Sequence, residues 1–132
     1  MSRFITSLDA RVGHCKIDGK WQRNVILDRP LDYASDLLGR IVVVPVGFTS
    51  DGASVPRALW NAYPPFGKYL EAAVVHDWFC VLGHKGESPI SSVTAAKVFR
   101  EAMEACGVSK FRRFKMYWAV RVGGPRFKAK VS

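Results

Sequence analysis

The chain has 132 residues, of which 48% are hydrophobic and 23% are charged, a balance typical of a folded protein and not of a disordered one. Its 20 Lys and Arg residues outnumber the 11 Asp and Glu residues, which gives a formal net charge of +9. Such a charge favours binding to polyanions or to an acidic protein partner, or a place near packaged nucleic acid in a particle. The length predicts a single domain over residues 1–132.

The cysteines and apolar runs bear on where the protein is made. Cys15, Cys80 and Cys106 are an odd number at wide spacing, which favours packed thiols or a reducing compartment over a disulfide framework. The N-terminus shows no basic and then apolar leader. The longest apolar runs, such as residues 41–46, are too short to cross a bilayer. We therefore expect no membrane span and synthesis in the cytoplasm.

Residues 1–47 are predicted to be rich in β structure. Residues 4–12 form a weak strand candidate. Asp18-Gly19 is typical of a hairpin turn, here between arms at residues 15–17 and 20–27.

The next two segments differ in character. Residues 31–39 have turn and short-helix character. Residues 40–46 are β-branched and apolar, which favours a central strand, although Pro45 indicates an edge or an end.

Residues 54–123 are predicted to be helical. Ser54 is a candidate cap for a short helix that starts at Val55 and covers Trp60. A longer helix is expected from about Lys68 to Leu82, ending at Gly83.

Two amphipathic helices are expected to follow. The first begins after Pro89 and is closed by Gly107. Its predicted apolar side consists of Val93, Ala96, Phe99, Met103 and Cys106, and its charged residues facing away are Lys97, Arg100, Glu101 and Glu104. The second is capped by Ser109 and spans residues 110–122, before a basic tail at 124–132. Its apolar side carries Phe111, Phe114, Trp118 and Val122. The expected fold is α+β, with a small N-terminal antiparallel sheet packed against three to four C-terminal helices.

The adjacent His76 and Asp77 are candidates for chemistry. The acidic loop at Ser50-Asp51-Gly52 is the natural segment to reach them, and Asp51, His76 and Asp77 would make a set suited to a divalent cation. Alternatively, Asp77 pairs with Arg57 or caps a loop, while His76 is a core histidine that donates to a carbonyl.

Two other kinds of site have weaker support. Cys80 and His84, taken with His14 and Cys15, match no familiar zinc spacing, so core thiols are favoured. Ser50 and Ser54 are candidate nucleophiles only if their loop folds back onto His76, and no third member of a triad is evident.

The C-terminal part is both basic and aromatic. Cations bind phosphates and aromatic rings stack on bases, so nucleic acid is one candidate ligand. Helical spacing of the aromatic residues is more often core packing, with the charges as a solvated face. The candidate polyanion-binding residues are Arg112, Arg113, Lys115, Arg126, Lys128 and Lys130.

Four segments in this order carry a resemblance to a known family. They are GFTSDGASVPR at 47–57, AAVVHDW at 72–78, FREAM at 99–103 and YWAVR at 117–121. With them the chain resembles the domain-of-unknown-function family numbered 1353, from tailed phages and prophages. The resemblance implies a phage or prophage origin and a shared cluster at Asp51, His76 and Asp77. It implies no settled activity.

Ala96 departs from the family pattern. Members usually carry an aspartate three residues before the phenylalanine that corresponds to Phe99. If that aspartate is a ligand or a base, its absence here weakens the case for catalysis.

Two hypotheses follow. In the first, the protein is a small basic virion-associated component of a tail, neck or head. Its expected partners are other phage structural proteins, and DNA is a candidate partner of its basic surface. In the second, it is a metal-dependent hydrolase of cell-wall or phosphorylated material, in which Asp51, His76 and Asp77 hold the cation and Ser50 or Arg57 orients the substrate. The loss at Ala96 and the high charge favour the first.

Overall fold

The computed structural model describes residues 2–6, 8–17, 20–50 and 70–130, and along residues 12–17 and 20–23 it describes the backbone alone. The predicted hairpin turn at Asp18-Gly19, the short helix capped by Ser54, and the start of the next helix at Lys68 lie outside the described residues.

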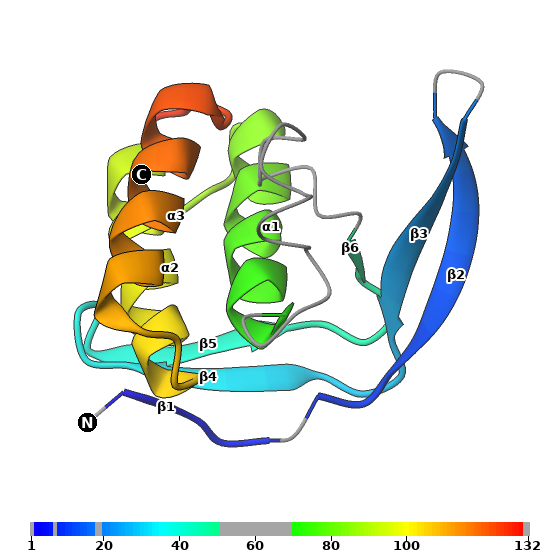
Figure 1. Cartoon of the computed structure of the whole chain (residues 1–132), viewed down its shortest axis with the longest axis horizontal. Helices are drawn as coiled ribbons and strands as arrows, with labels where there is room; N and C mark the ends of the chain where they lie inside the picture. Colours follow the sequence, from blue (N-terminus) through cyan, green and yellow to red (C-terminus); the bar gives the residue numbers. More distant parts are fainter. Residues whose placement is uncertain (1, 7, 18–19, 51–69, 131–132) are drawn as a thin grey trace.

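Two antiparallel sheets of three strands form the N-terminal part (Figure 1). The first has the order β1 (Arg3–Phe4), β4 (Leu31–Ser35), β5 (Arg40–Val44), and the second has the order β2 (Ala10–Ile17), β3 (Lys20–Leu27), β6 (Thr49–Ser50). The predicted hairpin is confirmed, because β2 and β3 pair from Ala10 opposite Leu27 to Ile17 opposite Lys20. This ribbon stands to one side of the helices (Figure 1).

The strand predictions are otherwise only partly right. Residues 31–35 form β4 and no helix, with alternate side chains buried as expected for a strand that covers a core on one face. The strand predicted over residues 4–12 is instead the end of β1 and the start of β2. β5 is an edge strand of its sheet, as Pro45 indicated, and not a central one.

From residue 70 onward the structure has three helices: α1 (Leu70–His84), α2 (Ser92–Ala105) and α3 (Lys110–Gly123). The cap predicted at Ser109 is confirmed, since its Oγ accepts a hydrogen bond from the Arg112 N–H. Gly107, with a φ of 79°, directly follows the C-cap of α2 and supplies the left-handed conformation that ends many helices.

The core lies where α1 and α2 pack on the sheet of β4 and β5, while α3 packs on α2. Its largest fully buried side chains include Tyr33 from β4, Phe79 from α1 and Phe99 from α2. The chain therefore has the predicted α+β fold, with sheets from the N-terminal part and helices from the C-terminal part. Among the described helices, none is both long and apolar enough to cross a membrane.

The C-terminal segment lies along the connection between α1 and α2. Ser92 N–H donates to the Phe127 carbonyl at 2.9 Å, and Lys130 N–H donates to the Ser88 carbonyl at 2.7 Å. The Phe127 ring lies so close to Gly83 that a Cβ there would fall 2.3 Å from the ring. Gly83 thus allows the tail to pack on the end of α1.

Candidate functional site

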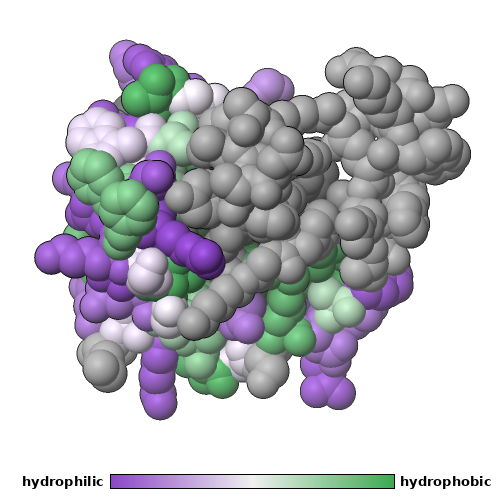
Figure 2. Space-filling model, in the orientation of Figure 1, coloured by the Kyte–Doolittle hydropathy of each residue, from purple (hydrophilic) through white to green (hydrophobic). Residues whose placement is uncertain are grey.

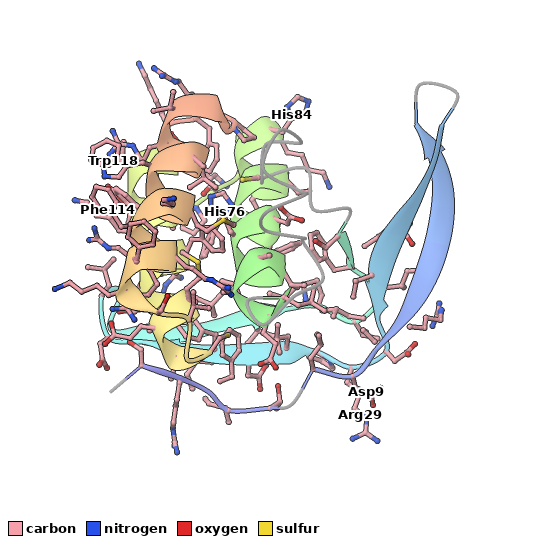
Figure 3. The ribbon with its side chains drawn as sticks, in the orientation of Figure 1. Asp9, Arg29, His76, His84, Phe114 and Trp118 are labelled. Atoms are coloured by element: carbon pink, nitrogen blue, oxygen red, sulfur yellow. The ribbon has the colours of Figure 1, made fainter. Side chains whose placement is uncertain are left out.

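His76 projects from α1 toward α2 (Figure 3). Only 4% of the residue is exposed, and its ring centroid lies 5.0 Å from that of Phe99. Cys80 Sγ lies 3.7 Å from His76 Nδ1. Burial lowers the pKa of His76 to about 4, so the ring is neutral at neutral pH. These contacts are those of a core histidine. Among the described residues, its polar contact is with the Cys80 thiol and not with the carbonyl that we expected.

Asp77 faces a different element. Its Oδ2 accepts a hydrogen bond from Ser50 Oγ of β6, and both residues are buried. Neighbouring residues on an α-helix point about 100° apart, so His76 contacts α2 while Asp77 contacts β6. Asp51 and Arg57 lie outside the described residues, so the approach of Asp51 to His76 and the Asp77–Arg57 pair stay predictions.

Within the part of the chain that the structure describes, no three His, Cys, Asp or Glu side chains gather as a metal site requires. Cys80 is half-buried, and its pKa is raised to about 12, by burial first and by the Asp77 charge second. The Cys80 side chain is therefore a protonated thiol at neutral pH. His84 is exposed at the end of α1 (Figure 3), and the side chains of His14 and Cys15 are not among those described.

Ala96 is fully buried in the core that also contains Phe99. An aspartate at this place would be a buried carboxylate, which a fold retains only with a partner. The methyl group of Ala96 needs no such partner. At this position the chain has an apolar core contact, whereas its relatives are expected to have a charged side chain.

Glu101 is the centre of a polar cluster that the sequence did not predict. We expected this residue to face away from the core, and that is wrong. Its Oε1 accepts hydrogen bonds from Tyr33 Oη and Ser35 Oγ at 2.7 Å each, and its Oε2 accepts one from Leu37 N–H at 2.8 Å. Burial, and then the bond to Glu101, raise the pKa of Tyr33 far above its ordinary value, so the phenol keeps its proton and donates it. Glu101 therefore joins α2 to β4 and the turn that follows it.

The apolar side predicted for the last helix is not in the core. The exposed fractions are 66% for Phe111, 61% for Phe114, 46% for Trp118 and 72% for Val122. These four residues share one face of α3 and are called the α3 stripe below. Phe114 and Trp118 point outward from the helix (Figure 3). The opposite face of α3, with Met116, Tyr117 and Val120, packs on the protein instead.

Basic side chains lie on both sides of the α3 stripe. At about 100° per residue, Arg112 and Lys115 fall along one edge of it and Lys110 and Arg121 along the other. Lys115 Nζ lies 4.4 Å from the centroid of the Phe111 ring, and Arg121 Cζ lies 5.8 Å from that of Trp118. On the side of the molecule where α3 lies, hydrophilic and hydrophobic residues alternate over the surface (Figure 2).

The predicted polyanion-binding residues divide into two groups. Arg112 and Lys115 are exposed beside the α3 stripe, whereas Arg113 is half-buried and donates from Nη1 to the Val108 carbonyl at 2.9 Å. Arg126, Lys128 and Lys130 are exposed on the tail that lies along the α1–α2 connection. The sequence prediction missed Arg121, which helical spacing from Trp118 would have found.

Acidic residues are absent from the sequence after Glu104. Residues 105–132 contain eight Lys and Arg residues and no Asp or Glu. The α3 stripe and the tail therefore belong to a stretch of chain that carries positive charge alone.

Comparison with known proteins gives the family of the chain but no activity. Two uncharacterized proteins of Sinorhizobium fredii (strain NBRC 101917 / NGR234) are similar to it: y4jT is 38% identical over 84 residues, and y4iH is 32% identical over 80 residues. These matches cover 62% and 59% of this chain but only 24% and 31% of the two relatives, so the chain spans a minor part of each. No solved structure matches it.

One family model matches residues 25–120, a range that runs from β3 through most of α3 and includes His76 and Asp77. Its description is "Protein of unknown function (DUF1353)". The match covers more than half of the chain, as the resemblance in its four sequence segments led us to expect. The chain belongs to the DUF1353 family.

Proposed function

We propose that this protein is a binding component without catalytic function, and that the α3 stripe and its basic borders hold single-stranded nucleic acid. The observation that carries the proposal is the exposure of three aromatic rings on one helix face, with cations along both edges. Monomeric proteins rarely expose large contiguous apolar patches unless the patch has a binding role.

Single-stranded nucleic acid matches this surface in two respects. Every base has a flat face that can stack on an aromatic side chain, and such stacking is worth about 1–3 kcal/mol per base. Phe114 and Trp118 present rings one helical turn apart, with centroids 6.5 Å from each other. The phosphates on either side of the bases would meet Lys115 and Arg112 along one edge, or Lys110 and Arg121 along the other.

Duplex nucleic acid matches the surface less well. Its bases are stacked on one another, so their faces are closed to protein rings, and phosphate contacts alone would leave the rings of the α3 stripe in water. The proposal therefore predicts a preference for single strands over duplexes of the same sequence.

The experiment is a fluorescence-anisotropy titration with a labelled single strand of about 16 nucleotides. If three or four cations contact phosphates, the affinity should fall about 30-fold between 50 and 200 mM salt. Phe114→Ala and Trp118→Ala should each weaken binding by about tenfold, since each removes one stacking platform. Ile41→Ala removes a similarly exposed apolar side chain from β5 and should leave the affinity unchanged.

The proposal would be overturned by the absence of saturable binding at low salt. It would equally be overturned if Phe114→Ala and Trp118→Ala bound the strand as tightly as the wild type. Anionic vesicles form a parallel arm of the experiment, because a helix with basic edges and an apolar stripe also suits a lipid surface. Binding to vesicles and not to the strand would replace nucleic acid by a membrane surface.

The setting that we propose is a phage or prophage particle, in its tail, neck or head, where packaged nucleic acid and other structural proteins are both at hand. The basic charge supports it, as does the sequence resemblance to phage proteins described above. Mass spectrometry of purified particles tests it. Detection of the chain only in the cytoplasm of the infected host would contradict it.

A metal-dependent hydrolase is the second candidate, and one contact supports it. The bond between Ser50 and Asp77 fixes the residue directly before Asp51 against α1. Elemental analysis of the purified protein, with and without chelator, tests this hypothesis. A stoichiometric cation that is lost in His76→Ala would support it, and no bound cation would remove it.

A further inference from the structure

A pocket of about 450 Å³ lies between α2, α3 and the turn between β4 and β5. Lys97 and Arg100 of α2 and Lys110 and Arg113 of α3 contribute four cations to its lining. Phe114 forms an aromatic part of the wall. Pockets of about 300–1,000 Å³ are the usual size for small-molecule ligands.

The charges of this pocket are not balanced from within. Its two carboxylates belong to Glu101 and Glu104, and both oxygens of Glu101 already accept hydrogen bonds from β4 and the turn that follows it. The salt bridges between described residues are Arg11–Asp28 and Arg29–Asp9, far along the chain from this pocket. Within the described part of the protein, the four cations therefore have no ion-pair partner, and an anionic ligand would supply one.

Two of the cations are held in place before any ligand arrives. The Arg100 guanidinium lies over the Tyr117 ring, with Cζ 4.5 Å from the ring centroid. Arg113 is held by its bond to the Val108 carbonyl, as described above. A guanidinium has five N–H donors, so each of these arginines keeps donors for a ligand. Side chains that are already ordered lose less entropy on binding.

Phe114 decides between the kinds of anion. Inorganic phosphate or a simple carboxylate would engage the cations and leave the exposed ring and most of the volume unused. A ligand that combines a flat ring with a phosphate would use both. We propose that this pocket binds a nucleoside monophosphate, with its phosphate among Lys97, Arg100, Lys110 and Arg113 and its base stacked on Phe114.

The pocket shares Phe114 and Lys110 with the surface proposed to bind a strand, so a nucleotide in the pocket and a strand on the α3 stripe would compete for these two side chains. Lys97 and Arg100 belong to α2 and lie outside the α3 stripe. A substitution at Lys97 therefore tests the pocket alone.

The experiment is a calorimetric titration of the whole chain at low salt with adenosine monophosphate, adenosine and inorganic phosphate. We expect saturable binding of the monophosphate, and binding at least tenfold weaker for the nucleoside and for inorganic phosphate, since each lacks one half of the interaction. Lys97→Glu should weaken binding of the monophosphate by about tenfold or more, and Lys97→Arg should retain it. Lys85→Glu reverses the charge of an exposed lysine that does not line the pocket, so it is the matched control and should not change the binding.

Three results would overturn the inference. They are no binding of the monophosphate, unchanged binding in Lys97→Glu, and inorganic phosphate that binds as tightly as the nucleotide. Loss of strand binding with the monophosphate still bound would refute the proposed function and leave the pocket. Binding of the strand without binding of the monophosphate would refute the pocket and leave the proposed function.

Discussion

Replacing Glu101 with alanine should destabilise the fold far more than a typical substitution on a helix surface. The change removes the common acceptor of Tyr33, Ser35 and the Leu37 N–H. Tyr33 is fully buried and Ser35 is 4% exposed, so water cannot readily replace the lost acceptor for either hydroxyl. The Leu37 N–H lies in an exposed turn and can bind water.

The magnitude follows from the two buried donors. A hydrogen bond to a charged group is worth about 1.5–3 kcal/mol, and a buried donor left without an acceptor costs a similar amount. We therefore expect Glu101→Ala to lower the free energy of unfolding by about 3–5 kcal/mol. Tyr33→Phe removes one of the donors and should cost about 1–2 kcal/mol, and it should cost clearly less when Glu101 is already alanine.

Urea denaturation followed by far-UV circular dichroism measures these free energies. Glu104→Ala is the matched control, since it removes an exposed glutamate from the same helix and should change stability by no more than about 0.5 kcal/mol. A loss below about 1 kcal/mol in Glu101→Ala, or costs that simply add in the double variant, would refute the role that we assign to this carboxylate.

Three other substitutions test separate contacts. Burial lowers the pKa of His76 to about 4 from an ordinary value of 6.5, so the unfolded chain takes up a proton on this imidazole before the folded chain does as the pH falls. The free energy of unfolding should therefore drop by about 2 kcal/mol between pH 7 and pH 5. His76→Gln should remove this part of the pH dependence, as urea denaturation at each pH can show. Gly83→Ala should destabilise the protein, because the new methyl group displaces the Phe127 ring. In a Phe127→Ala background the same change should be neutral or stabilising by up to about 1 kcal/mol, because alanine is favoured over glycine in a helix. Thermal melts measure both effects. Ser50→Ala should cost about 1–3 kcal/mol in urea denaturation, because it takes a donor from the buried Asp77 carboxylate.

Each of these has a control or a refuting outcome. Burial raises the pKa of Glu71, so this carboxyl favours the folded state as the pH falls, opposite to His76. The wild type and His76→Gln must therefore be compared at each pH. If the free energy of unfolding changed equally with pH in both proteins, the buried imidazole would not be neutral. Equal effects of Gly83→Ala with and without the Phe127 ring would show that the tail does not pack on α1. Thr49→Ala, at the exposed neighbour of Ser50, should change little, and a comparable loss in both variants would contradict the Ser50–Asp77 bond.

Local signals in the sequence predicted the helices better than the partners of their side chains. Ser109 and Gly107 act on backbone groups within a few residues, so the ends of α2 and α3 could be predicted from them. Glu101 could not be placed in this way, because its partner Tyr33 is 68 residues away in the sequence.

The exposed face of α3 shows a different limit. Periodicity identified Phe111, Phe114 and Trp118 as one face, and this is right. It could not say which face packs, because Met116 and Val120 give the opposite side enough apolar surface to cover α2. Likewise, β4 was missed because Asp32 and Ala34 are poor strand formers on their own, and pairing with β5 overrides that preference.

The order of the strands has a consequence for how the protein reaches its native state. The chain alternates between the two sheets, since β1 belongs to one, β2 and β3 to the other, β4 and β5 to the first again, and β6 to the second. Neither sheet is formed by one continuous stretch of the chain. The strands of each sheet can therefore pair only when the intervening strands have folded into the other sheet. We expect the two halves of the β region to assemble in one cooperative step, at a rate limited by the closure of long loops.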